Sequence, residues 1–366
     1  MTTTNPAAPA APLAPPDLAR IAKTVATKLP FRGDVTGLTP LAGDASNRRY
    51  FRVALKGKPS ALILMQLADP EGFKKSEEAV SGASVQIAEL PFTNVLAHLQ
   101  RTGVTVPQLH YYDREAGLLY LEDFGDLTLA EACRDADRAR LVSLYRQAID
   151  QLVLLQVKGT QPPAPGCIAF HRGFDVPLLM WEFDHFLEYG IVARLGQPMK
   201  PADDKAVRAE FQRIAELLAG QPQVFVHRDY HSRNLMVDGA RLGIIDFQDA
   251  LMGPATYDLA SLLKDAYIEL DDAVVDGLVD HFLDGLAAQG QGWADRAALR
   301  RLFDFTSIQR NLKAAGRFVY IDRVKHNPKF LADIPRVLGY VKRNLSKYPE
   351  LATLRQHLAP YVSELQ

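Results

Sequence analysis

Three polar side chains, Asp229, Asn234 and Asp246, have the types and the spacing that phosphoryl transfer needs. Asn234 directly precedes the apolar run 235–237, Asp246 directly follows the apolar run 243–245, and an Asp-Gly turn separates the two runs. An antiparallel hairpin built from these runs would place Asn234 and Asp246 side by side at its open end. An amide oxygen and a carboxylate held together suit Mg²⁺, which also takes phosphate oxygens.

Asp229 lies five residues before Asn234, in the run His227-Arg-Asp-Tyr-His-Ser-Arg-Asn234. This carboxylate is close to the expected metal pair without needing to bind the metal, so it is available to accept the proton of an attacking hydroxyl. The spacing matches the catalytic loop and the metal-binding aspartate of kinases. The alternative is that these residues only cap turns and satisfy loop amides. We predict that Asp229 is the catalytic residue and that Asn234 and Asp246 bind the metal.

Neighbouring residues of the same stretch have less definite roles. We expect His227 to anchor the loop by hydrogen bonding rather than to act in catalysis. His231 and Arg233 flank the metal pair and are candidates for contact with substrate or phosphate, with simple loop packing as the alternative. Asp258 begins a helical run and is expected to cap that helix and to brace the catalytic loop.

The elements that must position these residues follow from hydrophobic periodicity. Residues 49–55 and 60–65 predict a β-hairpin, and residues 92–99 predict a helix between Pro91 and Gly103. Two shorter strands are predicted at 108–112 and 118–121. After a polar break the pattern becomes helical, at 141–155, 179–187, 207–218 and from 258 to the end.

The pattern predicts an α+β fold with a small β-rich lobe, a short connector and a larger helical lobe. The expected boundaries are a flexible Pro/Ala-rich tail at 1–16, an N-terminal lobe at 17–121, a hinge at 122–127 and a C-terminal lobe at 128–366. A cleft between two lobes is a common place for a ligand.

Composition excludes several classes of protein. The 366 residues are 48% apolar and 23% charged, and 42 basic against 43 acidic residues leave a net charge of −1. This is not a disordered, collagen-like or disulfide-rich chain, and nothing in it indicates a nucleic-acid or membrane partner. The only two cysteines have no metal-site spacing, so we expect a reducing, cytoplasmic location. The expected partners are a nucleotide and a small molecule, and we expect a monomer.

The motifs 227–234, 245–248 and 257–260 resemble the aminoglycoside phosphotransferase-like family of small-molecule kinases, which share the protein-kinase fold. Segments 43–52, 121–126, 309–316 and 333–337 are similar, more narrowly, to those of the bacterial N-acetylmuramate/N-acetylglucosamine kinases. The resemblance implies ATP-dependent, Mg²⁺-dependent phosphorylation of the anomeric hydroxyl of an amino sugar. The product would be the sugar 1-phosphate, in cell-wall sugar recycling.

The resemblance also implies roles for individual residues. Asp229 would be the catalytic base, with Asn234 and Asp246 as the magnesium ligands. The loop over the ATP phosphates would be Gly43, Asp44, Ala45, Ser46 and Asn47, and the adenine pocket would be lined from the connector by Glu122, Asp123 and Phe124, mainly through backbone groups. The sequence departs from the family pattern in one respect, because the third strand lacks the lysine that contacts phosphate. Arg49, Arg52 or Arg48 is a candidate to replace its charge.

Charge is unevenly distributed. Residues 306–347 hold ten Lys or Arg and two Asp, a local balance of +8, so the rest of the chain sums to −9. The resemblance places this segment near the acceptor, where basic residues suit an anionic substrate such as the lactyl carboxylate of N-acetylmuramate. A solvated basic face is the alternative. The candidate substrate residues here are Arg310, Asn311 and Lys313, and Glu182 is a candidate to accept hydrogen bonds from sugar hydroxyls.

Other functions stay open at this point. A kinase for choline, homoserine, an aminoglycoside or another sugar would carry the same catalytic loop. A catalytically inactive nucleotide-binding scaffold is supported only by the missing lysine, since Asp229 and Asp246 are both present. Nothing in the sequence distinguishes N-acetylmuramate from N-acetylglucosamine.

Overall fold

The computed structural model describes residues 14–41, 48–67, 87–293 and 295–366. The chain divides into two compact units, Met1–Phe73 with Pro107–Asp123, and Lys74–Val106 with Phe124–Gln366. Among the described residues, no helix is long and apolar enough to cross a membrane. The lobe and hinge boundaries predicted from the sequence remain a prediction.

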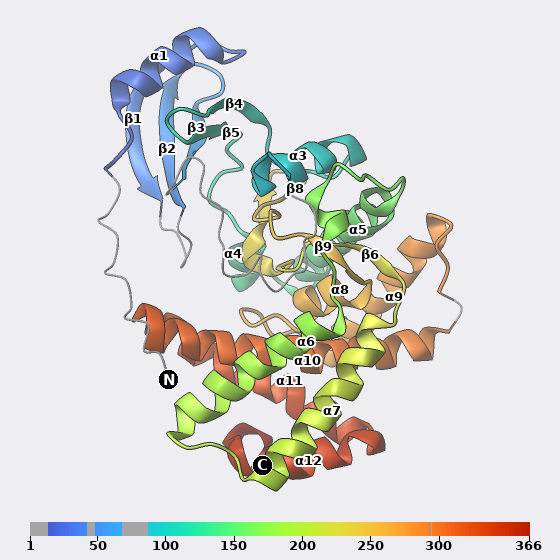
Figure 1. Cartoon of the computed structure of the whole chain (residues 1–366). Coiled ribbons are helices and arrows are strands. Elements are labelled where there is room, and N and C mark those ends of the chain that lie inside the picture. Colours follow the sequence, from blue (N-terminus) through green and yellow to red (C-terminus); the bar gives the residue numbers. More distant parts are fainter. Residues whose placement is uncertain (1–13, 42–47, 68–86, 294) are drawn as a thin grey trace. The chain divides into compact units, whose positions relative to one another are not determined.

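The first unit is built on one antiparallel sheet with the strand order β1-β2-β3-β5-β4. Helix α1 lies against this sheet in Figure 1, and its Ile21 and Val25 share a core with Phe51, Val53 and Leu64. Strand alternation explains why Phe51 and Val53 face the same side. The elements are α1 (Leu18–Lys28), β1 (Asp34–Leu41), β2 (Arg49–Lys56), β3 (Ala61–Gln66), β4 (Leu109–Asp113) and β5 (Leu118–Leu121).

The predicted hairpin and the two short strands are confirmed as β2, β3, β4 and β5. Helix α1 and strand β1 are not among the sequence predictions. Their signals were weak, since β1 contains Gly37 and Pro40 and has no clean alternation. Asp17, whose side chain accepts the Ala19 N–H, is the capping signal that marks the start of α1.

The second unit is mostly helical and confirms the predicted helices. Helix α3 ends at Gly103, which takes a left-handed conformation with φ of 81°. Its helices are α3 (Pro91–Thr102), α4 (Leu129–Arg134), α5 (Arg138–Thr160), α6 (Val176–His185), α7 (Pro201–Ala219), α8 (Thr256–Leu263), α9 (Asp272–Ala288), α10 (Arg296–Lys325), α11 (Ile334–Lys347) and α12 (Ala352–Leu358). Shorter helical segments are η1 (Ile168–His171), the π-helix η2 (Phe186–Ala193), η3 (Ser232–Asn234), η4 (Pro328–Asp333), η5 (Pro349–Leu351), η6 (Ala359–Tyr361) and η7 (Ser363–Leu365).

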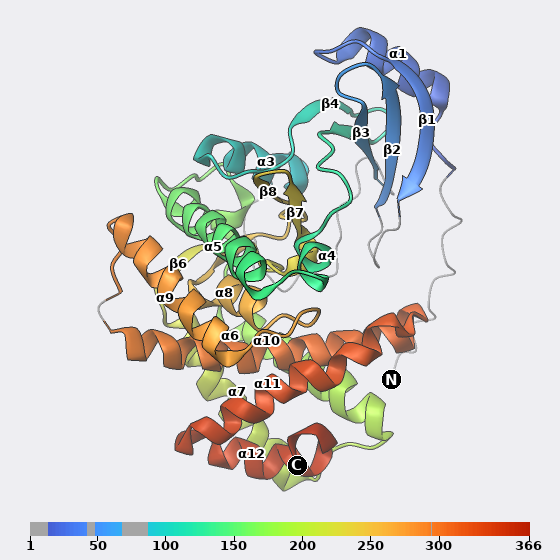
Figure 2. The same ribbon diagram turned by 180° about the vertical axis from the view of Figure 1, so that it is seen from behind.

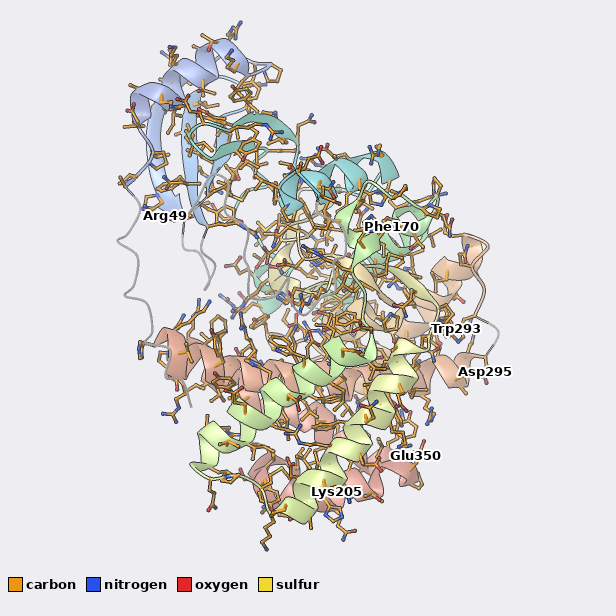
Figure 3. The ribbon with its side chains drawn as sticks, viewed as in Figure 1. Arg49, Phe170, Lys205, Trp293, Asp295 and Glu350 are labelled. Atoms are coloured by element: carbon orange, nitrogen blue, oxygen red, sulfur yellow. The ribbon has the colours of Figure 1, made fainter. Side chains whose placement is uncertain are left out.

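Helix α10 organises this unit. It is 30 residues long, and Asp295 caps its first turn by accepting the N–H groups of Ala297 and Ala298 (Figure 3). In Figures 1 and 2, α10 lies between the α6–α7 pair and α11, and side chains from all these helices share one buried core. Side chains therefore leave α10 toward several neighbours, and those near its middle reach the catalytic loop.

Two small two-stranded sheets carry that loop. Strand β6 (Gln223–Val226) pairs with β9 (Leu251–Pro254), and β7 (Leu235–Asp238) pairs with β8 (Arg241–Ile244), both antiparallel. The predicted hairpin is thus confirmed as β7–β8. The candidate catalytic loop is the connection from β6 to β7.

Candidate active site

The β7–β8 hairpin brings Asn234 and Asp246 to its open end, with a register that differs by one residue from the predicted one. Leu235 pairs with Ile244, so Asn234 lies opposite Ile245, whose N–H donates to the Asn234 carbonyl over 3.0 Å. The turn is centred between Gly239 and Ala240 rather than on Ala240, because the last pair is Asp238 with Arg241. Asp246 is therefore the next residue beyond the pair.

The backbone at Asp246 is in the left-handed region, with φ of 65°. A non-glycine residue in this conformation is uncommon, and such residues gather at functional sites. Gln248 Nε2 donates to Asp246 Oδ1 over 2.8 Å, which orients the exposed carboxylate.

The catalytic loop is braced by Asp258, which lies in the first turn of α8. Its carboxylate accepts the N–H groups of His227 over 2.6 Å and of Arg228 over 3.0 Å. Arg228 has a left-handed φ of 80°, so this carboxylate holds a backbone conformation that is otherwise unfavourable. The predicted brace is confirmed. The predicted cap is wrong, since Ala255 is the N-cap of α8 and Asp258 is the third helical residue.

His227 is fully buried, and its Nε2 makes a 2.9 Å hydrogen bond with the carbonyl of Ile245. This bond ties the start of the catalytic loop to the end of β8. The anchoring function predicted for His227 is what the structure shows.

Asn234 links the catalytic loop to the hairpin. Its Nδ2 donates to the Asp229 carbonyl over 2.9 Å, and this leaves the Oδ1 oxygen as the atom available to a cation. Oδ1 of Asn234 and the carboxylate of Asp246 are hard oxygen donors of the kind that Mg²⁺ takes, together with phosphate oxygens and water. The donor chemistry of the two predicted metal ligands therefore fits magnesium.

The Asp229 carboxylate is partly exposed and lies beside a cation from α10. Lys313 Nζ is 3.9 Å from Asp229 Oδ1, and the Asp229 side chain is 40% exposed. Burial alone would raise the pKa of Asp229, but the charges of Lys313, His231, Arg228 and Arg310 outweigh it and hold that pKa well below its usual range. The carboxylate is therefore ionised at neutral pH.

Glu182 on α6 is completely buried and connects the catalytic loop to α10. Its Oε1 lies 3.3 Å from Arg228 Nη2 and 3.5 Å from Lys313 Nζ. Its Oε2 accepts from Gln309 Nε2 over 2.9 Å and from the Tyr257 hydroxyl over 3.3 Å. These contacts hold the pKa of Glu182 low in spite of burial, so a charged carboxylate fixes the position of Lys313.

Of the other candidate substrate residues, Arg310 and Asn311 are buried on α10. Arg310 Nε and Asn311 Oδ1 have no hydrogen-bond partner among the described residues, and Asn311 Nδ2 donates to Ser307 Oγ over 3.0 Å. His231 accepts a long, 3.4 Å contact from Asn234 Nδ2, and burial lowers its pKa. Arg310 and His231 both belong to the electrostatic surroundings of Asp229.

Arg233 packs on aromatic rings, one of which, Tyr267, also meets the His231 ring edge to face at 5.2 Å. Its guanidinium lies 3.6 Å from the centroid of the Tyr267 ring, a close cation–π contact, and 5.8 Å from that of Phe330. The structure thus brings together Asp229, Glu182, Arg310 and Lys313, whereas Arg233 packs on aromatic rings. The substrate-binding roles of these residues remain predictions.

Of the predicted nucleotide-binding residues, Gly43, Asp44, Ala45, Ser46 and Asn47 lie outside the described residues. Arg49 stands 5.0 Å from the centroid of the Phe51 ring on β2. The alternative cation Arg52 forms a two-point ion pair with Asp123, with Nε 2.6 Å from Oδ2 and Nη2 3.1 Å from Oδ1. Strand β3 indeed carries no lysine.

The predicted connector residues belong to different units: Glu122 and Asp123 to the first, and Phe124 to the second. Glu122 exchanges backbone and side-chain hydrogen bonds with Gln108 in the first unit. Phe124 is buried in the second unit, where its ring lies against Gly243 of β8 so closely that a Cβ there would be 2.4 Å from Phe124 Cε2. Glycine is needed at 243 for this contact. The nucleotide-binding roles of these residues remain predictions.

Sequence reasoning missed Asp265, a second buried brace of the catalytic loop. Its Oδ2 accepts the Ser232 N–H over 2.9 Å and its Oδ1 accepts the Tyr267 N–H over 3.0 Å. No local signal marks it, because Asp265 is 33 residues from Ser232 in the sequence. Its burial and its two backbone donors appear only in the folded chain.

Comparison with known proteins decides the family. The model of the phosphotransferase enzyme family matches residues 37–300, which include the whole catalytic loop and the hairpin. The chain belongs to this phosphotransferase family. It is therefore an enzyme, as the catalytic loop predicts.

Curated relatives of this phosphotransferase match along most of its length. An N-acetylmuramate/N-acetylglucosamine kinase of Pseudomonas putida is 34% identical over 327 residues, covering 88% of this chain and 87% of the relative. A protein of the same name from Neisseria meningitidis is 31% identical over 329 residues, covering 89% and 91%. The predicted resemblance is confirmed.

Solved structures show the same fold at much lower identity. A putative aminoglycoside phosphotransferase of Ralstonia eutropha aligns with a TM-score of 0.59 at 11% identity, covering 93% of this chain and 98% of that one. A choline/ethanolamine kinase family protein of Mesorhizobium loti aligns with a TM-score of 0.55 at 18% identity, covering 94% and 99%. The phosphotransferase thus has the protein-kinase-like fold that was predicted.

Proposed function

We propose that this phosphotransferase transfers the γ-phosphoryl group of ATP to the anomeric hydroxyl of N-acetylmuramate or N-acetylglucosamine. The product is the sugar 1-phosphate, and the activity serves cell-wall sugar recycling. The observation that carries the proposal is the ionised Asp229 carboxylate beside Lys313, in a loop fixed by Asp258 and tied by Asn234 to the open end of the hairpin. The names of the relatives from Pseudomonas and Neisseria support the acceptor.

Asp229 is assigned as the group that orients the acceptor hydroxyl and takes its proton. The hydroxyl O–H bond breaks, the oxygen forms a bond to the γ-phosphorus, and the bond from that phosphorus to the leaving ADP oxygen breaks. The low pKa of Asp229 makes it a weak base, which suits phosphoryl transfer, since catalysis there is mostly positioning and electrostatic stabilisation. Lys313 supplies a fixed positive charge next to the reacting hydroxyl.

Asn234 Oδ1 and Asp246 are assigned as the protein ligands of Mg²⁺. When bound, the ion supplies positive charge to the β- and γ-phosphate oxygens. Gln248 holds the Asp246 carboxylate in place from the protein side. One of the fold neighbours, an aminoglycoside phosphotransferase with a TM-score of 0.56 at 12% identity, was solved with ADP, which supports nucleotide use in this fold.

An acceptor panel tests the proposal. Purified protein with ATP and Mg²⁺ is offered N-acetylmuramate, N-acetylglucosamine, choline, homoserine and an aminoglycoside in a coupled ADP-release assay. We expect turnover with one or both amino sugars. Phosphorus NMR of the product then shows whether C1 carries the phosphate. Turnover confined to choline, homoserine or the aminoglycoside would contradict the proposal.

The family match speaks against the inactive nucleotide-binding scaffold that the missing third-strand lysine left open. Magnesium-dependent ADP release with any acceptor excludes it. We further propose a cytoplasmic location, because both cysteines are free and buried, as in a reducing compartment, and we propose that the protein is a monomer. Light scattering after gel filtration measures the mass in solution, and a dimer mass would contradict the monomer.

A further inference from the structure

A cluster of aromatic side chains lies on the face that α6 and the π-helix η2 turn toward α10. Trp181 stacks on His185 with ring centroids 5.7 Å apart, and His185 is 4.8 Å from Tyr189 and 5.4 Å from Tyr320. Tyr189 and Tyr320 meet edge to face at 5.1 Å. All four side chains are partly exposed. We call these four residues the aromatic cluster.

Two cations of α10 join the aromatic cluster to the catalytic carboxylate. The Arg317 guanidinium carbon is 4.8 Å from the centroid of the Tyr320 ring, and Lys313, one turn earlier, is 3.9 Å from Asp229. Residues 313, 317 and 320 are four and three positions apart, so they share one face of the helix. The surface therefore runs from Asp229 along α10 to the aromatic cluster.

His185 lies within the field of both cations. Burial lowers its pKa first, and the charges of Arg317 and Lys313 lower it further, to about 4. Its imidazole is therefore neutral at physiological pH and can both donate and accept a hydrogen bond. The buried Nε2 atom has no partner among the described residues.

Gly316 allows the aromatic cluster to form. A Cβ at 316 would lie 2.7 Å from Phe186 Cα and 3.0 Å from the His185 carbonyl oxygen, both backbone atoms. The close approach of α10 to η2 thus requires glycine. π-helical turns are rare and occur often at functional sites.

We propose that the aromatic cluster and Arg317 form the acceptor-binding surface and that Arg317 selects a sugar that carries a carboxylate. The inference rests on the proposed function and deepens it. Aromatic rings offer flat apolar faces for the C–H groups of a sugar ring, and an arginine fork matches a carboxylate in two hydrogen bonds. Arg317 lies about 6 Å along the helix axis from Lys313, at the standard rise per residue. This span is comparable with a hexose ring whose reacting hydroxyl is at Asp229.

Kinetics of Arg317→Ala with two acceptors test the selection. The KM for N-acetylmuramate is expected to rise about tenfold or more, as for loss of one charge-assisted hydrogen bond. The KM for N-acetylglucosamine, which has no carboxylate, is expected to stay within about twofold. Arg317→Lys keeps the charge and should recover part of the loss. The matched control is Arg323→Ala, an exposed arginine of the same helix paired with Asp322.

Direct binding separates this inference from the proposed function. The chain contains two tryptophans, Trp181 in the aromatic cluster and Trp293 in the connection before α10 (Figure 3). In a Trp293→Phe background the fluorescence reports on Trp181 alone, so we expect N-acetylmuramate to change it saturably, without nucleotide. Arg317→Ala in that background should weaken the response about tenfold.

The possible outcomes differ. If N-acetylmuramate binds through Arg317 but neither sugar is phosphorylated, the inference stands and the kinase assignment fails. If both sugars are phosphorylated and Arg317→Ala changes the KM for neither sugar, or changes both KM values equally, the inference is overturned and the activity stands. Absence of any fluorescence response, with unchanged kinetics in the variants, also overturns it.

Discussion

The ammonium group of Lys313 lies 3.9 Å from the carboxylate of Asp229, although 84 residues separate them in the sequence. The same ammonium group lies 3.5 Å from Glu182, which is completely buried. A lysine held between a buried and a partly exposed carboxylate has a fixed position. Helix α10 therefore places a positive charge next to Asp229, the carboxylate that we propose activates the acceptor hydroxyl.

Replacing Lys313 with Met should shift the pH profile of the enzyme. Lys313 is the largest of the charges that lower the pKa of Asp229, with His231, Arg228 and Arg310 acting in the same direction. Without it the pKa of Asp229 rises toward its ordinary value. Because protonated Asp229 cannot accept a proton, the acid limb of kcat/KM moves to higher pH. Steady-state rates from pH 2 to 9, with each variant checked for folding across that range, measure the shift.

We also expect turnover of Lys313→Met at pH 7.5 to fall about tenfold or more, because a charge close to the reacting group is lost. Lys325→Met, an exposed lysine at the end of α10, is the matched control and should leave both the profile and the rate unchanged. An unchanged acid limb in Lys313→Met would show that Lys313 does not act on Asp229.

Asp229→Asn should separate binding from chemistry. The amide keeps the shape of the side chain and removes the proton acceptor, so turnover falls at least about a hundredfold, as for loss of a general base. Nucleotide affinity, measured by calorimetry, is expected to change little because Asp229 is not assigned to the metal. Near-normal turnover by this variant would contradict the assignment of Asp229 as the proton acceptor.

Asp258→Ala should destabilise the fold as well as the catalytic loop. The variant leaves the N–H groups of His227 and Arg228 buried without their acceptor, at a cost of about 1–3 kcal/mol each. Urea unfolding measures the loss. Asp184→Ala, which removes an exposed ion pair with Arg208, should cost less than about 1 kcal/mol. Equal losses in the two variants would show that Asp258 is not a brace.

Because of Asp258, we also expect the free energy of unfolding to depend on pH. Burial raises its pKa to about 7, above the value of an unfolded chain, in spite of the two backbone donors. The folded state then binds the proton more tightly, so this contribution to stability is present below about pH 4 and is lost as the pH rises through 7. The stability difference between the native protein and Asp258→Asn, which does not titrate, should therefore be larger at pH 5 than at pH 8.

Local sequence was sufficient to predict the β7–β8 hairpin, the loop that precedes it, and most helices and strands. The hairpin at 235–244 follows from two apolar runs and an Asp-Gly turn, and α3 follows from its helical period between Pro91 and Gly103. Periodicity alone did not fix the register, because the turn centre can shift by half a residue. Asn234 consequently pairs with Ile245 and not with Asp246.

Contacts made over long sequence separations could not be predicted from local patterns. In the sequence, Glu182 is one polar residue of an amphipathic helix, and nothing local indicates that it is buried. In the fold its carboxylate is in contact with Arg228, Gln309, Tyr257 and Lys313. The π-helical turn of η2 also carries no sequence signal of its own. Its close approach to α10 requires Gly316, more than a hundred residues later in the sequence.

Asp246→Asn tests the metal assignment. Adding excess EDTA, which chelates Mg²⁺, to the native protein should abolish turnover. The variant should need about tenfold or more Mg²⁺ for half-maximal rate, because an amide is a weaker ligand for a hard cation than a carboxylate. Asp238→Asn, at the turn end of the same hairpin, is the matched control and should keep the native magnesium dependence. Magnesium titrations at saturating ATP distinguish the two. Identical titration curves for the two variants would remove Asp246 from the metal site.

Gly316→Ala tests the packing that supports the aromatic cluster. The added methyl group would lie 2.7 Å from Phe186 Cα, a backbone atom that cannot rotate away, so α10 and η2 must move apart. We expect a loss of about 1–3 kcal/mol in stability, as for overpacking. We also expect the KM for the acceptor to rise relative to the native protein, and the KM for ATP to change less.

Gly339→Ala on α11 is the control, because a Cβ there meets nothing within 4 Å. Alanine has the better helix propensity, so the control should be neutral or more stable by up to about 1 kcal/mol. Thermal unfolding and acceptor kinetics of the two variants provide the comparison, and a Gly316→Ala protein as stable and active as the control would show that the close approach is not required.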